Sequence, residues 1–285
     1  MATTGQSDPL LLRLKLPLRL KQLKQRVLIK KLNSALDAVR RYFDTPVPAR
    51  EDDGIPADQP VSDLFTFDRT GWLRQGLLED SMVKWESEPG VYVIAKLSGQ
   101  PTLPYDLSQP ELFRTDVSES LTKAGQCLID FDLIEVQGVQ GYKCVFKYYA
   151  TEAEDDLRKS YYGTLCFPLS THKVLISTLS NEEGTSGVRE STVTMMLIAE
   201  RELKLPTADA PPAKRVAEDG ETLVKMLKKQ PLQVAPSDAP DYDDTFPDHP
   251  LTRVRRTLAH IQATLSFDET LKAMGPYRVD TNTKS

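Results

Sequence analysis

Two aspartates, Asp130 and Asp132, are the first candidates for chemistry in this chain of 285 residues. They lie two positions apart in the run CLIDFDLIEV, which alternates polar and apolar residues over part of its length, as a strand with one solvated face does. Residues two apart on a strand point to the same side, so the two carboxylates could share a bound cation or a proton. A solvated sheet face produces the same alternation and is the default interpretation.

Histidine is the side chain most often used for acid–base chemistry near neutral pH, and the chain has His172, His249 and His260. The last two are 11 residues apart, so they do not form a metal-binding pair at i and i+4 of one helix. We expect capping or surface roles for them. A hydrolase or transferase is the alternative, and it requires Asp130, Asp132 and His172 to converge on one pocket.

Three cysteines, Cys127, Cys144 and Cys166, lie inside strand-like segments. Their number and spacing fit neither a disulfide framework nor a Cys-x-x-Cys metal site, which favours a reducing compartment and predicts a cytoplasmic protein. Small buried side chains are common in strands. We therefore expect these thiols to pack in the core rather than to act as nucleophiles.

The sequence lacks the motifs of several common catalytic sites. It has no Gly-x-Gly-x-x-Gly, no Gly-Lys-Ser/Thr phosphate loop, no Gly-x-Ser-x-Gly and no His-Glu-x-x-His. The acidic run Asp241, Asp243, Asp244 and Asp248 lacks the glycine and the bidentate glutamate of an EF-hand, so we expect it to be a solvated part of a linker. We predict no metal, no cofactor and no enzymatic activity.

Charge divides the chain into two parts. Residues 1–50 contain 11 Lys and Arg against 3 Asp and Glu, a net charge of +8, so the net charge of −5 for the whole chain leaves −13 for residues 51–285. Only the N-terminal part has the clustered positive charge that binds an anionic surface. The candidate partner-binding residues in this basic arm are Lys15, Arg19, Lys21, Lys24, Arg26, Lys30 and Lys31.

The cations of the arm alternate with leucines and have almost no aromatic neighbours. This composition fits an acidic protein partner or an anionic membrane surface better than nucleic acid, whose bases stack on aromatic rings. Charged residues interrupt every apolar stretch, so we predict neither a secretory signal peptide nor a transmembrane span. Docking of the arm on the acidic remainder of its own chain is the structural alternative.

Composition also predicts the organisation of the chain. After Pro17, apolar residues spaced by three and four positions predict an amphipathic helix at about 18–43, and clustered prolines mark two linkers. We predict a basic amphipathic arm at 1–45, a Pro-rich acidic linker at 46–63, an α+β domain at 64–205, a Pro-rich connector at 206–247, a C-terminal helix at 248–272 and a tail at 273–285.

Five segments rich in β-branched and aromatic residues predict strands, at 91–97, 127–136, 143–149, 163–169 and 173–179. Turn residues between them favour hairpins, so the predicted fold class is α+β with a central antiparallel sheet of about five strands. A helix from about 187 to Pro206 should cover this sheet. The C-terminal helix, capped by Asp248, should pack at the periphery.

The order of elements in the central region resembles a known group. An exposed strand pair precedes YYGTLCFPLSTHKVLISTLSNEEG, and a helix then starts at SGVREST with Arg189 and Glu190 after a Gly-rich turn. This pattern, over about residues 90–205, resembles the antiparallel α+β domain of the Mog1/PsbP group, which includes the bacterial DcrB-like proteins. The resemblance implies a binding or accessory module rather than a catalyst, since members of the group commonly assist other assemblies.

Together these features predict a non-catalytic interaction or accessory protein, such as an immunity-like or secretion-associated module, that engages an acidic partner through its basic arm. A peripheral membrane-binding protein is a further alternative beside the hydrolase or transferase.

Overall fold

The computed structural model describes residues 64–79, 82–99, 101, 103, 107–151, 153, 156–200 and 227–279. All of them belong to the compact unit Phe43–Ser285. The predicted helix at 18–43 and the seven candidate cations of the arm lie outside the described residues.

The described elements alternate strands with a few helices. In chain order they are β1 (Phe65–Thr66), β2 (Leu73–Glu79), β3 (Met82–Glu88), β4 (Val91–Ser98), α3 (Pro110–Lys123), β5 (Cys127–Val136), β6 (Val139–Tyr149), β7 (Lys159–Pro168), β8 (Lys173–Asn181), α4 (Val188–Ala199), the 3-10 helices η1 (Pro236–Asp238) and η2 (Pro240–Tyr242), α6 (Pro250–Thr264), β9 (Ser266–Phe267) and α7 (Glu269–Ala273). None of the helices in the described ranges is long and apolar enough to cross a membrane.

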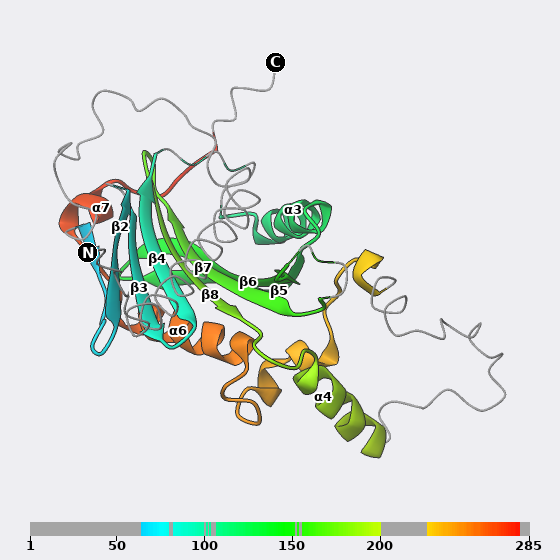
Figure 1. Ribbon diagram of the computed structural model, residues 1–285. Coiled ribbons are helices and arrows are strands. Elements are labelled where there is room, and N and C mark those ends of the chain that lie inside the picture. The colour runs from blue at the N-terminus through cyan, green and yellow to red at the C-terminus, as the bar shows by residue number, and fades with distance from the viewer. Residues whose placement is uncertain are drawn as a thin grey trace, which may run out of the picture. The chain divides into compact units, whose positions relative to one another are not determined.

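A seven-stranded antiparallel sheet organises the described part of the chain, with the strand order β2-β3-β4-β8-β7-β6-β5 (Figure 1). Strands β5 to β8 form a meander, and β8 pairs with β4 in the middle of the sheet. The predicted α+β class and the antiparallel sheet are confirmed, and the five predicted strands correspond to β4 to β8.

The expected strand number of about five is wrong, because β2 and β3 extend the sheet at one edge and β1 pairs with β9 in a separate two-stranded sheet. Strand β2, with the sequence LRQGLLE, contains no β-branched residue, and its pairing with β3 is irregular at two places. Strand propensity therefore did not mark it.

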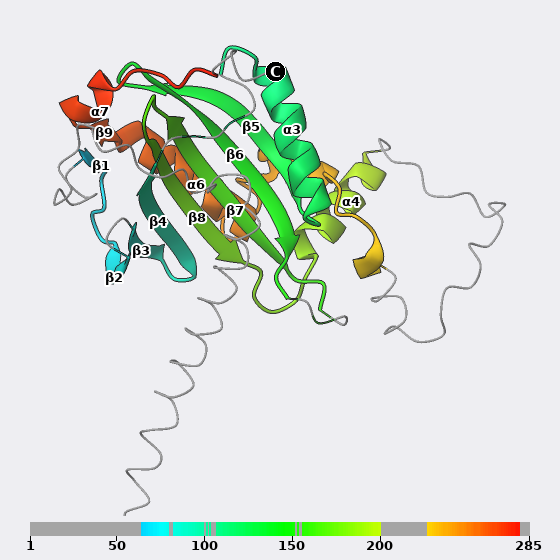
Figure 2. The same cartoon turned by 90° about the horizontal axis from the view of Figure 1, so that it is seen from above.

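Helix α6 lies across one face of the sheet and forms the centre of the core (Figure 2). Leu251, Val254, Leu258 and Ile261 repeat at helical spacing and are fully buried. Burial of side chains of this size stabilises a fold by roughly 1.5–3 kcal/mol each. The expected peripheral position of this helix is wrong, because its apolar stripe needs a large apolar surface and is buried on the face of the sheet.

The first turn of α6 also differs from the expectation. The N-cap is His249 rather than Asp248, and the backbone N–H of Leu251 donates to His249 Nδ1 at 3.2 Å. Pro250 fills the first helical position, where its missing N–H costs nothing, and this places the cap at the residue directly before it.

Gly163 on β7 allows α6 to approach the sheet closely. A Cβ atom at this position would lie 2.5 Å from Leu258 Cδ1 and 2.8 Å from Val254 Cγ1. Both separations are well inside the contact distance of about 3.5–4.0 Å between carbon atoms. The absent side chain of Gly163 therefore determines how deeply α6 packs.

The opposite face of the sheet is covered at β5 and β6 by α3 (Figure 2). The ring of Phe113 on α3 lies 4.8 Å from that of Tyr142 and 5.7 Å from that of Phe131. Cys144 and Cys166 are buried in the sheet, and burial raises the pKa of the Cys166 thiol to about 11. The expected packing of the cysteines is confirmed, and burial keeps these thiols in their less reactive protonated form.

Helix α4 does not cover the sheet, contrary to the expectation. It lies next to η1, beyond the ends of the strands (Figure 1). Gly184 and Gly187 both have a positive φ, 73° and 76°, in the turn that follows β8, and this left-handed backbone directs the chain away from the sheet. The helix buries Arg189, Val193 and Leu197.

The contact between Gly163 and α6 yields a first prediction. The substitution Gly163→Ala should lower the free energy of unfolding by about 1–3 kcal/mol, because the new methyl group overpacks the interface. Leu258→Ala alone should cost about 2–5 kcal/mol through the cavity that it leaves. Urea denaturation of both variants and of the double variant tests the contact: the combined loss should be clearly smaller than the sum, and additive losses would contradict it.

Candidate functional site

Charged side chains gather at the end of the sheet where β6 ends, β7 begins and β8 ends. The register brings these ends together, because Lys147 is opposite Tyr161 and Tyr161 is opposite Ser180. Helix α4, the two 3-10 helices and the first turns of α6 meet the same end. We call this group of side chains the charge cluster; its members are Asp130, Lys147, Lys159, Glu182, Arg189, Glu190, Asp238, Asp243, His249 and Arg255.

The most buried pair of the cluster joins β6 to η1. Lys147 Nζ lies 2.5 Å from Asp238 Oδ2, and the two side chains are only 2% and 3% exposed. The same oxygen of Asp238 accepts a hydrogen bond from the backbone N–H of Ala235 at 2.7 Å. Two charges removed from water this completely require each other, since either one alone would carry a large desolvation cost.

Arg189 joins α4 to the segment that leads into α6. Its guanidinium donates to the carbonyl oxygens of Ser237 and Ala239, at 2.6 and 3.0 Å. It also donates to Thr252 Oγ1 at 2.8 Å and to Asp243 Oδ1 at 2.9 Å. The Arg189 side chain is almost fully buried, and its guanidinium donates in several directions at once. These bonds hold the side chain in one orientation.

Arg255 joins α6 to the edge strand β5. Its Nε and Nη2 atoms donate to the two carboxylate oxygens of Asp130, at 2.7 and 3.0 Å, and Nη2 also donates to the carbonyl oxygen of Asp238 at 2.6 Å. Burial disfavours the charged guanidinium, but Asp130 and Asp243 outweigh it and raise the pKa of Arg255. The expected solvated role of Asp243 is wrong, because this carboxylate bridges Arg189 and Arg255.

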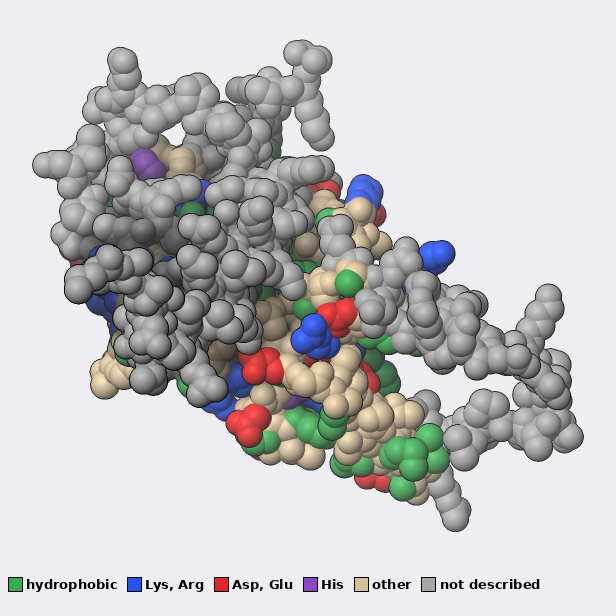
Figure 3. Space-filling view, in the orientation of Figure 1, with side chains coloured by type: hydrophobic (Ala, Val, Ile, Leu, Met, Phe, Trp, Pro, Cys, Tyr) green, Lys and Arg blue, Asp and Glu red, His purple; other side chains and the backbone are tan. Residues whose placement is uncertain are grey.

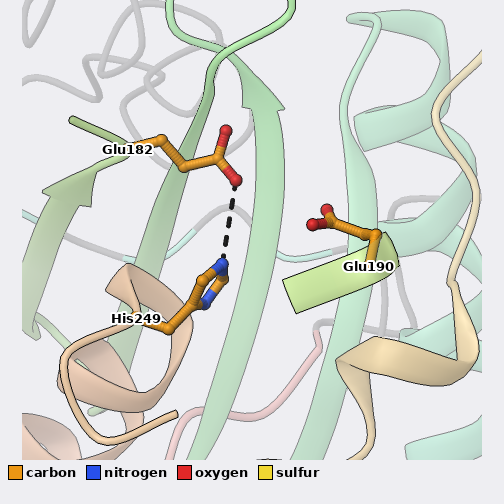
Figure 4. Close-up of side chains that lie close together, drawn as sticks. All are labelled: Glu182, Glu190 and His249. Atoms are coloured by element: carbon orange, nitrogen blue, oxygen red, sulfur yellow. Dashed lines mark ion pairs between the residues drawn. The ribbon is translucent and has the colours of Figure 1, made fainter. Parts of the chain in front are cut away.

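Glu182, Glu190 and His249 form the part of the cluster whose chemistry could bind a ligand (Figure 4). One ligand atom from each residue lies within 4.8 Å of the other two, and Glu182 Oε1 is 3.7 Å from His249 Nε2. Lys159 makes an ion pair with Glu190, and its backbone N–H donates to Glu182 Oε2 at 2.8 Å. Four parts of the fold, namely the start of β7, the end of β8, α4 and the start of α6, thus bring two carboxylates, an imidazole and an ammonium group together.

Burial and pairing act in opposite directions on these groups. Burial disfavours the ammonium of Lys159, but the Glu190 carboxylate, with smaller contributions from Glu182 and Asp238, raises the pKa of Lys159. Burial likewise disfavours the carboxylate of Glu190, but the Lys159 ammonium outweighs it and lowers the pKa of Glu190. Both residues are therefore charged in the folded protein.

Some polar atoms beside this pair have no hydrogen-bond partner among the described residues. They are Glu190 Oε2, His249 Nε2 and the hydroxyl oxygen of Tyr161, all buried. The Tyr161 ring is 5.2 Å from that of His249, and burial, followed by the Glu190 and Glu182 carboxylates, raises the pKa of Tyr161. Buried polar atoms without a partner require an explanation such as a bound water or ion.

The residues proposed for a hydrolase or transferase do not converge. Asp130 pairs with Arg255 and Asp132 with Lys143, while His172 Nδ1 lies 3.0 Å from Thr171 Oγ1 in the turn after β7. Asp130 is opposite Val145, which is opposite Gly163, and Pro168 lies five residues further along β7. At 3.3–3.4 Å per residue, His172 is therefore at least about 17 Å from Asp130 along the strands.

Sequence reasoning missed five of the ten residues of the charge cluster: Lys147, Lys159, Glu182, Asp238 and Arg255. Arg189 and Glu190 entered only through the resemblance, and Asp238 was assigned to a connector. One local signal existed: in VRESTVTMMLIA an adjacent Arg and Glu occupy a mainly apolar helix, where charged residues are rarely buried without partners. The positions of those partners depend on tertiary structure.

A pocket and an apolar surface lie beside the cluster. The pocket, of about 510 Å³, is lined by Lys159, by Gly187 at the start of α4, and by apolar side chains that include Tyr149, Leu157 and Leu227. Val188 and Met195, seven residues apart on one face of α4, are 54% and 65% exposed. In Figure 3, apolar side chains are visible at the surface around α4.

Comparison with known proteins finds similarity only at the level of structure. No protein-family model and no curated protein matches the chain. The Ran-binding protein Mog1p of Saccharomyces cerevisiae is 14% identical with a TM-score of 0.30, over 50% of this chain and 80% of its own. A mutant of the protein Mog1 is 16% identical with a TM-score of 0.32, over 45% of this chain and 78% of its own.

A third solved structure, the cyanobacterial PsbP of Synechocystis, is 15% identical with a TM-score of 0.26, over 55% of this chain and 93% of its own. These matches confirm the weak Mog1/PsbP-like resemblance that the order of elements in the sequence indicates.

The buried pair of Lys147 and Asp238 yields a second prediction. Lys147→Met should lower the free energy of unfolding by about 3–5 kcal/mol, because Asp238 then stays buried without a counter-charge. The double variant Lys147→Met with Asp238→Asn should recover part of this loss. Lys143→Met is the control, since Lys143 and Asp132 are 30% and 57% exposed and such a pair contributes less than about 1 kcal/mol. Equal losses from the two single variants would contradict the assigned role of burial.

Proposed function

We propose that this chain is a non-catalytic interaction protein that engages an acidic protein partner through its N-terminal basic arm. The charge distribution carries the proposal: residues 1–50 hold a net charge of +8 on a chain whose remainder holds −13. Separated charges of opposite sign steer a complementary partner to one end of a protein and repel it from the other.

The use of charged side chains in the folded unit supports a non-catalytic role. Asp130 and Asp132, which the sequence offered for chemistry, are engaged in ion pairs with Arg255 and Lys143, and Asp243 of the acidic run pairs with Arg189. These contacts fasten elements to one another. The proposed role of the cluster is therefore to hold the fold that carries the arm.

The surface of α4 favours a protein over a membrane as the partner. Val188 and Met195 lie on one face, about two helical turns apart, and Met196 and Ile198 beside them are partly exposed. A patch of neighbouring, solvent-exposed apolar side chains is typical of a surface that binds another protein. We propose that the acidic partner contacts this face as well as the arm, and that it does so in the cytoplasm, a location that the three free cysteines support.

The proposal predicts that both surfaces reach the same partner. A photo-crosslinking amino acid is placed in the full chain at Lys24 in the arm, at Met195 on α4 and, as a control, at Glu119 on the exposed side of α3. The first two positions should crosslink the same acidic protein in cells, and the third should not.

Salt and charge provide the second half of this test. Crosslinking should fall several-fold when the seven arm cations are replaced by glutamine, and also when ionic strength rises from 0.05 to 0.3 M, because the Debye length shortens below about 10 Å. As a control, replacing Arg114, Lys123 and Lys229 of the compact unit by glutamine should have little effect on crosslinking. Crosslinking of Lys24 only to lipid, or only to the chain itself, would contradict the proposal and favour a membrane-binding or a self-docked arm.

A further inference from the structure

We propose that Glu182, Glu190 and His249 bind one divalent transition-metal cation of the zinc type. This inference is independent of the proposed partner of the arm. It rests on the arrangement of the three side chains, on the unpartnered atoms around them and on the charge of the cluster.

The donor set and spacing suit such an ion. Zinc is held by imidazole nitrogen and carboxylate oxygen at about 2.0–2.2 Å, so ligand atoms around a tetrahedral ion lie about 3.3–3.5 Å apart. Glu182 Oε1 and His249 Nε2 are already 3.7 Å apart, and all three ligand atoms lie within 4.8 Å of one another (Figure 4). Small side-chain rotations close the remaining gap.

The unpartnered atoms point to the same place. Glu190 Oε2 and His249 Nε2 are buried and have no hydrogen-bond partner among the described residues, although Glu182 Oε1 lies 3.7 Å from His249 Nε2. The hydroxyl of the fully buried Tyr161 is a third such atom. A cation would be bound by the first two atoms, and a water molecule in its fourth coordination position would be within reach of the third. The side chains of Glu190 and His249 are 23% and 12% exposed, which leaves a route of entry.

The charge of the cluster also favours a cation. It contains five carboxylates, those of Asp130, Glu182, Glu190, Asp238 and Asp243, but only four permanent cations, Lys147, Lys159, Arg189 and Arg255. These nine side chains together carry one more negative than positive charge. Buried carboxylates are stable when a counter-charge is close, and a metal ion supplies it.

Two contacts compete with the metal, and they make the proposal specific. The Lys159 ammonium pairs with the other carboxylate oxygen of Glu190, Oε1, and so repels a cation bound at Oε2. In addition, the N-cap bond from Leu251 to His249 Nδ1 requires the ring proton on Nε2, whereas a metal at Nε2 requires it on Nδ1. Metal binding therefore breaks the cap, and one N-cap bond is far weaker than coordination by three protein ligands.

The test is a titration of the full chain with ZnCl₂ by isothermal calorimetry, after removal of metal by EDTA. The wild type should bind one zinc ion, and Glu182→Gln and His249→Asn should each weaken binding by about a hundredfold or more. Asparagine is itself a good N-cap, so His249→Asn removes the ligand while keeping the start of α6. His260→Gln is the control, because His260 contacts the carbonyl oxygen of Asp68 near the other end of α6.

Two readouts separate this site from zinc bound elsewhere. Lys159→Met should strengthen binding by about tenfold or more, since the competing cation is removed. Hydrogen exchange of the Leu251 amide should become faster when zinc is added to the wild type, because the cap bond is lost. The proposal would be overturned if the wild type bound no zinc, or if the Glu182→Gln and His249→Asn variants bound zinc as tightly as the wild type. An exchange rate of the Leu251 amide that zinc leaves unchanged would overturn it as well.

Discussion

Pairing of buried charges is the constraint that orders the end of this sheet. Lys147, Asp238 and Arg189 are almost completely removed from water, where a single uncompensated charge is very costly. These three residues and their partners come from β6, α4, η1, the residues around η2 and α6. A single pair is not shielded from water until the other elements are in place. These elements must therefore pack over the strand ends together, and the cluster makes their packing cooperative.

Helix α6 connects this polar end to the apolar core. Val254 and Leu258 pack on the sheet at Gly163, whereas Thr252 and Arg255, on another side of the same helix, bond to Arg189 and Asp130. The depth that Gly163 allows determines where the guanidinium of Arg255 lies. Apolar packing and ion pairing therefore require the same position of α6. Agreement of this kind between different interactions favours a single fold.

The arrangement also explains why residue types suited to catalysis need not perform it. Carboxylates and cations in the charge cluster neutralise one another at short range, and most of their bonding capacity is used between elements. The part built from Glu182, Glu190 and His249 differs, because two of its buried atoms have no hydrogen-bond partner in the described part of the chain. This difference separates the part of the cluster that holds the fold from the part proposed to take a ligand.

The sequence by itself determined the periodic features of this protein. Alternating and β-branched segments predicted β4 to β8, helical spacing of leucines predicted α6, and the buried cysteines followed from their strand context, because these patterns depend on neighbours along the chain. Only tertiary structure decided that α6 is central, that α4 lies beyond the sheet, that Asp238 is buried and that Asp243 bridges two arginines. The partners of those aspartates are Arg189, Arg255 and Lys147, which lie 12 to 91 residues away in the chain. Local composition does not record which distant charges a fold brings together.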